Sequence, residues 1–344
     1  MENYNSLLQL LRKALNPSWE SVLPEGIEWE KALAIATRQG VSAMCFEAIE
    51  RLRAGSIPKT QLLQWYGQTE IQRGQYERAW DVARKLDRLW AADDIHATVL
   101  KGRAIAQYYP VPHHRYSCDL DVFIGQEWER ACEMLEGKGV KLEREVYKEV
   151  EFTVDGVYVE CHRYITPVRG NKQLQAFERY LRSLLNSNPP TSFEGTTLVC
   201  PPLMFTVMLY VEHALGDLLH GDLTLKHIVD WVILRRQAVD WKVFNAKCKE
   251  FKFDRFVALI EALADVVEGK QEYGSLPASY QEVFEEMFQE QAAAQPRSWF
   301  QRRLQLFFDI IKNGKKYRKY GYTSMPSFLF NSVWTHFFDK EVRL

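Results

Sequence analysis

The sequence lacks several features that would assign a class at once. Its 344 residues carry 44 lysines and arginines against 45 aspartates and glutamates, so the formal charge of −1 provides no overall attraction to nucleic acid or anionic membranes. None of the six cysteines forms a CxxC pair, which argues against a disulfide framework. We expect reduced, mostly buried thiols, as in a cytosolic protein.

Long apolar segments are also missing. The stretch PPLMFTVMLYV at 201–211 is among the longest, and it is too short and too soon followed by charge to span a bilayer. The N-terminus has no basic region followed by an uninterrupted apolar run, so we do not expect a signal peptide. These features predict a cytoplasmic protein without a transmembrane segment.

The remaining composition is that of a globular protein, with 47% hydrophobic and 26% charged residues. Helical periodicity dominates both ends of the chain, and β-rich stretches occur only between them. The sequence therefore predicts an α+β fold: a small mixed-sheet core at 93–200, flanked by an N-terminal helical region at 1–92 and a C-terminal helical domain at 201–344.

Within the N-terminal region we expect a helix break at Gly40 and a long amphipathic helix after Pro58. The aromatic residues of this long helix recur at helical spacing, which favours packing over a ligand site. Its expected buried face comprises Leu62, Trp65, Tyr66, Tyr76, Trp80, Ala83 and Leu86.

The central region predicts strands at 95–100 and from Asp119, with helices at 103–109 and 126–139. The segments EVEFTV and VYVECHRYI flank the dipeptide Asp155-Gly156, which favours a tight two-residue hairpin turn. The segment NSNPPTSFEGTTLVCPP at 186–202 is interpreted as a loop that leaves this region.

The motif HHRYSCDLDVFIG at 113–125 places Asp119 and Asp121 two positions apart on the expected strand. Alternation puts both acids on one face, and on the hairpin it puts Glu160 on the face shared with His162. If the two strands are neighbours, three carboxylates converge and can hold two Mg²⁺ ions for in-line attack on phosphorus. Each motif alone is weak, and an isolated DxD is more often structural.

Phosphate contacts are expected from LKGRAIA at 100–106, because a glycine before a helix lets the backbone approach an anion closely. Lys101, Gly102 and Arg103 lie at this turn, and Arg115 lies four residues before Asp119.

The order of these motifs resembles the polymerase-β-like nucleotidyltransferase superfamily. LKGRAIAQYYPVPHHRYSCDLDVFIG, VECHRYI and HALGDLLHGDLTLKHIVDWVIL are similar, more closely, to a bacterial family of largely uncharacterised nucleotidyltransferases, over roughly residues 35–290. The resemblance implies a nucleotidyltransferase core with Gly102 at the turn. It also implies that Asp119, Asp121 and Glu160 are catalytic metal ligands.

The same resemblance singles out three residues of the C-terminal domain, His213, Lys226 and Asp230. Lys226 is a candidate nucleotide contact, whereas His213 and Asp230 have supporting roles. Lys226 and Asp230 are four residues apart on one helical face, where an ion pair between them is as plausible as contact with a ligand. His162 either orients Glu160 or serves only the hairpin.

Two positions depart from the family pattern. Cys118 stands where a glycine usually precedes the first aspartate, and Arg103 stands where the superfamily favours glycine or serine. The leading hypothesis is magnesium-dependent transfer of a nucleoside monophosphate from an NTP, with ATP as the first expectation and Mn²⁺ as an alternative ion. The alternative hypothesis, which these departures suggest, is a non-catalytic nucleotide-binding or regulatory module.

The acceptor cannot be read from the sequence: a small molecule, an RNA end and a protein side chain all offer hydroxyl groups. A basic and aromatic C-terminal segment, KKYRKYGYTSMPSFLFNSVWTHFF at 315–338, suggests peripheral membrane contact as a further alternative. A solvated helix end is the simpler interpretation of its basic run.

Overall fold

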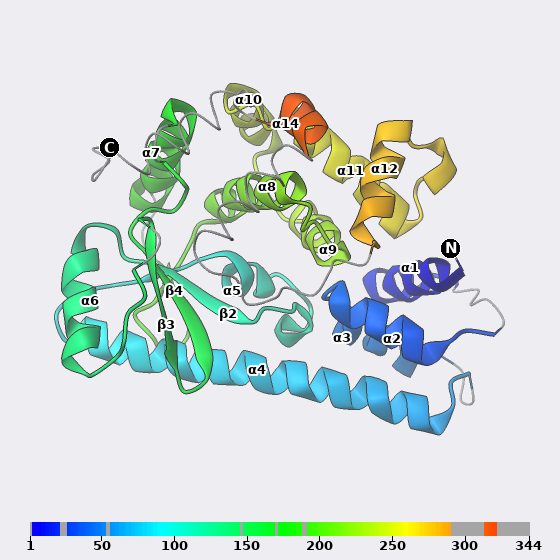
Figure 1. Cartoon of the computed structure of the whole chain (residues 1–344), viewed down its shortest axis with the longest axis horizontal. Helices are drawn as coiled ribbons and strands as arrows, with labels where there is room; N and C mark the ends of the chain where they lie inside the picture. The colour runs from blue at the N-terminus through cyan, green and yellow to red at the C-terminus, as the bar shows by residue number, and fades with distance from the viewer. Residues whose placement is uncertain are drawn as a thin grey trace.

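The computed structural model describes residues 2–20, 26–52, 56–144, 147–168, 171–187, 191–289 and 313–321. A mixed six-stranded sheet in the order β3-β4-β2-β1-β6-β5 lies at its centre. Helices precede and follow this sheet in the chain, which confirms the predicted α+β class (Figure 1). The strands are β1 Thr98–Val99, β2 Asp119–Phe123, β3 Glu149–Val154, β4 Val157–His162, β5 Thr191–Ser192 and β6 Val199–Cys200.

The predicted hairpin is present as β3 and β4. Asp155 and Gly156 both have positive φ angles, 49° and 76°, as the two central residues of a tight hairpin turn require. This turn sets the register, which places Glu149 opposite His162. Strand β4 also pairs in parallel with β2, so the hairpin lies beside the strand that carries the two aspartates.

The interpretation of residues 186–202 as a loop is wrong in part. Strands β5 and β6 lie within this segment, and β6 pairs in parallel with β1. Each of these strands has two residues, which is too short to produce the alternating pattern that identifies a strand in a sequence.

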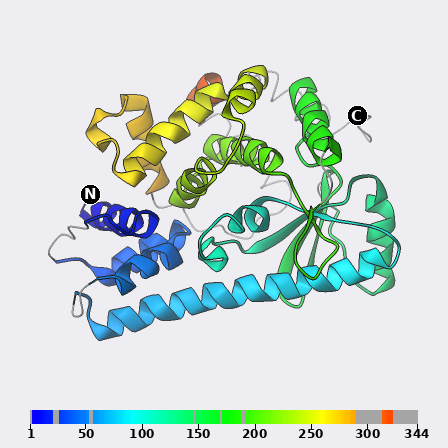
Figure 2. The same ribbon diagram turned by 180° about the vertical axis from the view of Figure 1, so that it is seen from behind.

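The N-terminal helices follow the prediction closely. They are α1 Glu2–Leu15, α2 Trp29–Arg38, α3 Ser42–Glu50 and α4 Lys59–Ala91. The break falls at Gly40, whose φ of 69° lies in the left-handed region that favours glycine. Helix α4 runs beneath both the helical region and the sheet (Figures 1 and 2). Its buried face includes Trp65 and Leu86, but the expectation for Tyr66 is wrong, because this residue is 50% exposed.

The remaining helices complete the structure around the sheet. They are α5 Lys101–Ala106, η1 Pro112–His114, η2 Gly125–Glu127, α6 Trp128–Gly137, α7 Lys172–Ser187, α8 Leu203–His220, α9 Leu225–Leu234, α10 Trp241–Glu250, α11 Asp254–Glu268, η3 Tyr273–Ser275, α12 Ala278–Met287 and α14 Gly314–Tyr320. The expected boundaries after residues 92 and 200 fall just beyond the ends of α4 and β6.

Two hydrophobic cores hold the described residues together. One face of the sheet, with Leu120, Val122 and Val159, packs against apolar residues of α4 and α6. The second core unites α1–α3 with the C-terminal helices and includes Phe123 from the other face of β2. The acidic face of the sheet is therefore turned toward α5 and the C-terminal helices, and α5 itself contacts both β2 and α8.

All six cysteines are free thiols, and four of them are buried, as predicted. No helix in the described ranges has the length and apolar character to cross a membrane. In the basic C-terminal run, Lys316 pairs with Glu286 at 2.6 Å and Lys319 lies over the ring of Tyr280. Residues 322–338 of the proposed membrane-contact segment lie outside the described residues.

Candidate active site

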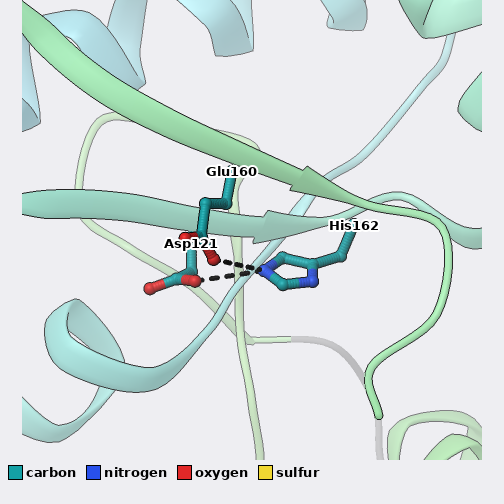
Figure 3. Close-up of side chains that lie close together, drawn as sticks. All are labelled: Asp121, Glu160 and His162. Atoms are coloured by element: carbon teal, nitrogen blue, oxygen red, sulfur yellow. Dashed lines mark hydrogen bonds and ion pairs between the residues drawn. The ribbon is translucent and has the colours of Figure 1, made fainter. Parts of the chain in front are cut away.

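Asp121 and Glu160 lie opposite each other on the parallel strands β2 and β4. Because side chains alternate along a strand, Leu120 and Val159 enter the core beneath the sheet while the two carboxylates project from its other face. His162, two residues beyond Glu160, shares that face. Figure 3 shows the three side chains converging from the two strands.

These three residues form a group with the geometry of a cation site. Asp121, Glu160 and His162 each offer a ligand atom, and the three atoms lie within 4.8 Å of one another. His162 Nε2 is 3.0 Å from Asp121 Oδ1 and 3.4 Å from Glu160 Oε2. The histidine therefore contacts both carboxylates, and the alternative in which it orients Glu160 stays a prediction.

Lys101 supplies a positive charge to the same two carboxylates. Its Nζ lies 2.6 Å from Asp121 Oδ1 and 3.1 Å from Glu160 Oε2. Burial lowers the pKa of Lys101, but the two carboxylates outweigh burial and hold the pKa above its usual value. Lys101 begins α5 with a φ of 44°, so its backbone adopts a left-handed conformation that is uncommon for a residue with a side chain.

Each charge in this group is balanced by a neighbour. Burial and Lys101 lower the pKa of His162, but its hydrogen bond to Asp121 and its close contacts with the carboxylates of Glu149 and Glu160 raise it overall to about 9. Burial raises the pKa of Asp121 despite the opposing effects of Lys101 and His162. For Glu160, in contrast, His162 and Lys101 outweigh burial and lower the pKa well below its usual value.

Glu149 lies next to the cluster of Asp121, Glu160 and His162, on the side of the His162 ring that faces away from Asp121. Its carboxylate lies 2.8 Å from His162 Nδ1 and 2.7 Å from Lys148 Nζ. Although burial acts in the opposite direction, His162 and Lys148 lower the pKa of Glu149 to about 2. The ionised carboxylate of Glu149 therefore contacts Nδ1 of His162, while Nε2 of the same ring faces Asp121 and Glu160.

Asp119 lies on the same face of β2 as Asp121 but outside the compact group of potential ligand atoms. The Ser117 hydroxyl donates a hydrogen bond of 2.8 Å to Asp119 Oδ1. Cys118, between these two residues, is exposed. The structure thus brings Asp121 and Glu160 together directly, and the predicted role of Asp119 as a metal ligand stays a prediction.

The absence of a side chain at Gly102, near the start of α5, is explained by steric contact. A Cβ atom at Gly102 would collide with the guanidinium of Arg115 and the hydroxyl of Ser117. This turn therefore packs tightly against the segment that leads into β2, and the residue at position 102 sets how closely the two approach.

Arg103 is buried between α5 and α4. Its guanidinium lies 4.9 Å from the ring centre of Tyr76 and donates a hydrogen bond of 3.3 Å to the Ser117 carbonyl. Burial lowers the pKa of Arg103 to about 10. These contacts account for an arginine at this position, because its side chain joins α4 to the Ser117 segment.

Arg115, in the segment that leads into β2, and Asp230 on α9 form a buried ion pair between the sheet region and the C-terminal helices. Arg115 donates to Asp230 at 2.8 Å and 3.2 Å, and the Tyr109 hydroxyl donates at 2.6 Å. Burial raises the pKa of Asp230, but Arg115 and Tyr109 lower it overall. Asp230 thus holds the guanidinium of Arg115, and the supporting role of Asp230 and the phosphate contact of Arg115 stay predictions.

Lys226 does not pair with Asp230, although the two lie on one helix. Among the described residues, no ion pair within 4.0 Å involves the Lys226 ammonium, and the aliphatic part of its side chain lies against Gly40. Burial and the charge of Arg115 lower the pKa of Lys226. Asp119 is among its charged neighbours, so Lys226 is a cation with free bonding capacity close to the acidic strand.

His213 lines a narrow cavity together with Lys101, Arg115 and Asp230. Its Nε2 lies 3.6 Å from Asp217, which also pairs with His227 at 3.0 Å. Desolvation lowers the pKa of His213, although 44% of its side chain is exposed. The predicted site residues His213, Lys101 and Arg115 are therefore brought to one cavity.

Several residues of the site were missed by the sequence argument. Glu149 could have been found, because a two-residue turn at Asp155-Gly156 pairs residue 149 with residue 162. Ser117 and Asp217 gave no comparable signal, since an isolated serine or aspartate is common in loops and on helices.

A family model described as "Uncharacterised nucleotidyltransferase" matches residues 25–267. The match covers well over half of the chain, so the protein belongs to this nucleotidyltransferase family, and the expected resemblance to an uncharacterised nucleotidyltransferase family is confirmed. The matched range includes Lys101, Asp121, Glu160 and Lys226. No curated protein and no solved structure gives a significant match.

Proposed function

We propose that the protein transfers a nucleoside monophosphate from an NTP, with ATP the first candidate, to a hydroxyl group of an acceptor in the cytoplasm. In this reaction the acceptor oxygen forms a bond to the α-phosphorus, the bond to the β-phosphate breaks, and pyrophosphate leaves. The proposal is supported most strongly by one observation: Asp121 and Glu160 converge on one face of the sheet in a member of a nucleotidyltransferase family.

The donor set fits a hard divalent cation. Two carboxylates are held close together in a largely buried place, where like charges require a cation nearby. Carboxylate oxygens are the ligands that Mg²⁺ and Mn²⁺ prefer. We propose that Asp121 and Glu160 hold the ion or ions, with Asp119 as a third ligand.

Bound divalent ions would supply charge stabilisation for the triphosphate and the departing pyrophosphate. The chain's own residues prepare for them: His162 holds both carboxylates in place, and Glu149 holds His162. A protonated His162 is a poor ligand, so its contribution is to position the acids rather than to bind the ion.

Positive side chains surround the place where the triphosphate would lie. The Lys226 ammonium lies near Asp119 and forms no ion pair with a described residue, so it is able to bind a phosphate. The Lys101 ammonium pairs with Asp121, and it is able to bind a phosphate in place of this carboxylate. Gly102 lets the start of α5 approach the Ser117 segment, and Asp230 fixes Arg115 beside it. We propose that Lys226 and Lys101 contact the phosphates, supported by Gly102, Arg103 and Arg115.

The test is magnesium-dependent transfer of label from α-labelled ATP to acceptors in a cell extract, followed by intact-mass analysis of the products. The wild-type protein is expected to release pyrophosphate and label a product. The double variant Asp119→Asn/Asp121→Asn is expected to do neither. Equal behaviour of the two proteins would refute the proposal.

A non-catalytic nucleotide-binding module is the second candidate. The observation that favours it is the internal neutralisation of the site, because Lys101 and Arg115 already pair with carboxylates of the chain. Calorimetry discriminates the two candidates: binding of ATP without release of pyrophosphate on addition of extract would favour the module.

A further inference from the structure

Glu212 on α8 is a buried carboxylate that differs from the others in the described structure. It is 7% exposed, and no hydrogen bond or ion pair connects it to another described residue. By contrast, the buried Glu178 accepts hydrogen bonds from the backbone N–H groups of Ile165 and Thr166. Glu212 has no such structural partner.

The charged neighbours of Glu212 are those of the acidic site. Lys148 and Lys101 attract its negative charge, and Asp217 and Glu178 repel it. Lys101 is the residue that contacts Asp121 and Glu160, and Lys148 is the residue that contacts Glu149. Glu212 on α8 therefore lies within electrostatic range of the two lysines of the site.

The adjacent residue supports this placement. His213 lines the same cavity as Lys101, and Leu209, one helical turn earlier, lines it as well. The face of α8 that carries Leu209 and His213 thus borders the space between the helical part and the acidic face of the sheet, and Glu212 is the residue just before His213 at the edge of that face. At Gly216, one turn further on, an added Cβ would meet no atom within 4 Å, so this face is open there.

Burying a carboxylate without a partner costs free energy, and a group placed only for packing would more favourably be an amide or an apolar side chain. Burial is the largest cause that raises the pKa of Glu212, to about 7. A carboxylate in this condition takes up and releases a proton near neutral pH, which is the property of an efficient general base.

We propose that Glu212 accepts the proton of the acceptor's attacking hydroxyl group. This inference rests on the proposed function. As the acceptor oxygen forms its bond to the α-phosphorus, the O–H bond breaks and the proton passes to the Glu212 carboxylate, while pyrophosphate leaves with the electrons of the broken P–O bond. The acceptor is therefore an alcohol that enters from the side of α8.

Glu160 is less suited to this role. It is held by Lys101 and His162, and these two cations lower its pKa well below its usual value. A carboxylate with so low a proton affinity is a weak base. Glu160 lies beside two cations and Glu212 does not, so the two acids differ in proton affinity. This difference assigns the ligand role to Glu160 and the proton-accepting role to Glu212.

The test uses the full chain with α-labelled ATP, Mg²⁺ and glycerol as the hydroxyl probe, and it measures pyrophosphate release between pH 5 and pH 9. For Glu212→Gln we expect a rate lower by about 10²–10⁴-fold, the usual contribution of a general base. Its binding of a fluorescent ATP analogue should stay unchanged. The fall in rate that wild type shows below about pH 7 should be absent in the variant. Glu212→Asp, which keeps the carboxylate, should recover part of the rate.

The matched control is Glu261→Gln on α11, where the side chain is 41% exposed and its carboxylate pairs with Arg235 away from the site. It should behave as wild type. A Glu212→Gln protein with the wild-type rate and pH profile would overturn the inference and leave the proposed function standing. Loss of ATP-analogue binding or of thermal stability in Glu212→Gln would assign the residue a structural role and also overturn it. Absence of pyrophosphate release in wild type would instead refute the proposed function itself, and this inference with it.

Discussion

Asp121 and Glu160 lie opposite each other on parallel strands and share one ammonium group, that of Lys101, at 2.6 Å and 3.1 Å. Two carboxylates on one face of a sheet repel each other, and Lys101 compensates this repulsion from within the chain. A divalent cation that binds the same oxygens must compete with this lysine.

Replacement of Lys101 should therefore strengthen metal binding. In Lys101→Met the ammonium is lost but the length of the side chain is kept. We expect Mn²⁺ to bind at least about tenfold more tightly, equivalent to ~1.4 kcal/mol. The metal-free variant should be less stable than wild type because two acids lose their cation. Electron paramagnetic resonance of free Mn²⁺ and thermal melts with and without metal measure both effects, and weaker Mn²⁺ binding would contradict this account of Lys101.

The steric role of Gly102 predicts a large effect for a small substitution. In Gly102→Ala the new methyl group meets Arg115 and Ser117, so the segment before β2 must shift. We expect a loss of about 1–3 kcal/mol in the free energy of unfolding and weaker binding of ATP. Gly137→Ala is the matched control, since its Cβ would meet no atom within 4 Å. Urea unfolding of both variants is the measurement, and equal stability would disprove the tight approach at position 102.

The Arg115–Asp230 pair predicts a difference between buried and exposed ion pairs. Asp230→Asn leaves the Arg115 guanidinium buried without its counter-charge, which should cost about 3–5 kcal/mol of stability. Asp81→Asn breaks a surface pair with Arg84 and should cost at most about 1 kcal/mol. Chemical unfolding curves compare the two, and similar small losses would show that the buried pair does not hold the segment before β2 to α9.

Glu212 predicts a pH-dependent difference in stability between wild type and Glu212→Gln. Its pKa is raised from 4.5 to about 7 in the folded protein, so the folded state binds the proton more tightly than the unfolded state. The stability that this proton contributes is complete below about pH 4.5 and is lost as the pH rises through about 7. Relative to the variant, wild type should lose about 3 kcal/mol over this range. Lys148, Lys101, Asp217 and Glu178 surround Glu212 in both proteins, so the comparison isolates its carboxyl group. A difference independent of pH would exclude the raised pKa.

The parts of the structure that depend on short-range patterns were predictable. Alternation along two strands and the turn at Asp155-Gly156 placed Asp121 and Glu160 on one face, and the parallel pairing of β2 with β4 completed the arrangement. The turn also implied the pairing of Glu149 with His162. These relationships follow from a period of two and from a turn of known length.

The parts that depend on tertiary packing were not predictable. Arg115 and Asp230 are separated by more than a hundred residues, and nothing local to either indicates that they pair. Lys101 was expected to contact phosphate, but the left-handed start of α5 brings its ammonium to the carboxylates. Glu212 follows an apolar run on α8, and only the packing of that helix reveals that its carboxylate is buried near two lysines.

The most direct test of the central claim is the binding of Mn²⁺ to Asp121→Asn and to Glu160→Gln, measured by isothermal titration calorimetry beside wild type. Asp254→Asn, which alters an exposed carboxylate at the start of α11, serves as the control. The account predicts that wild type and Asp254→Asn bind Mn²⁺ alike and that both site variants lose binding. Unchanged Mn²⁺ binding in the two site variants would contradict it.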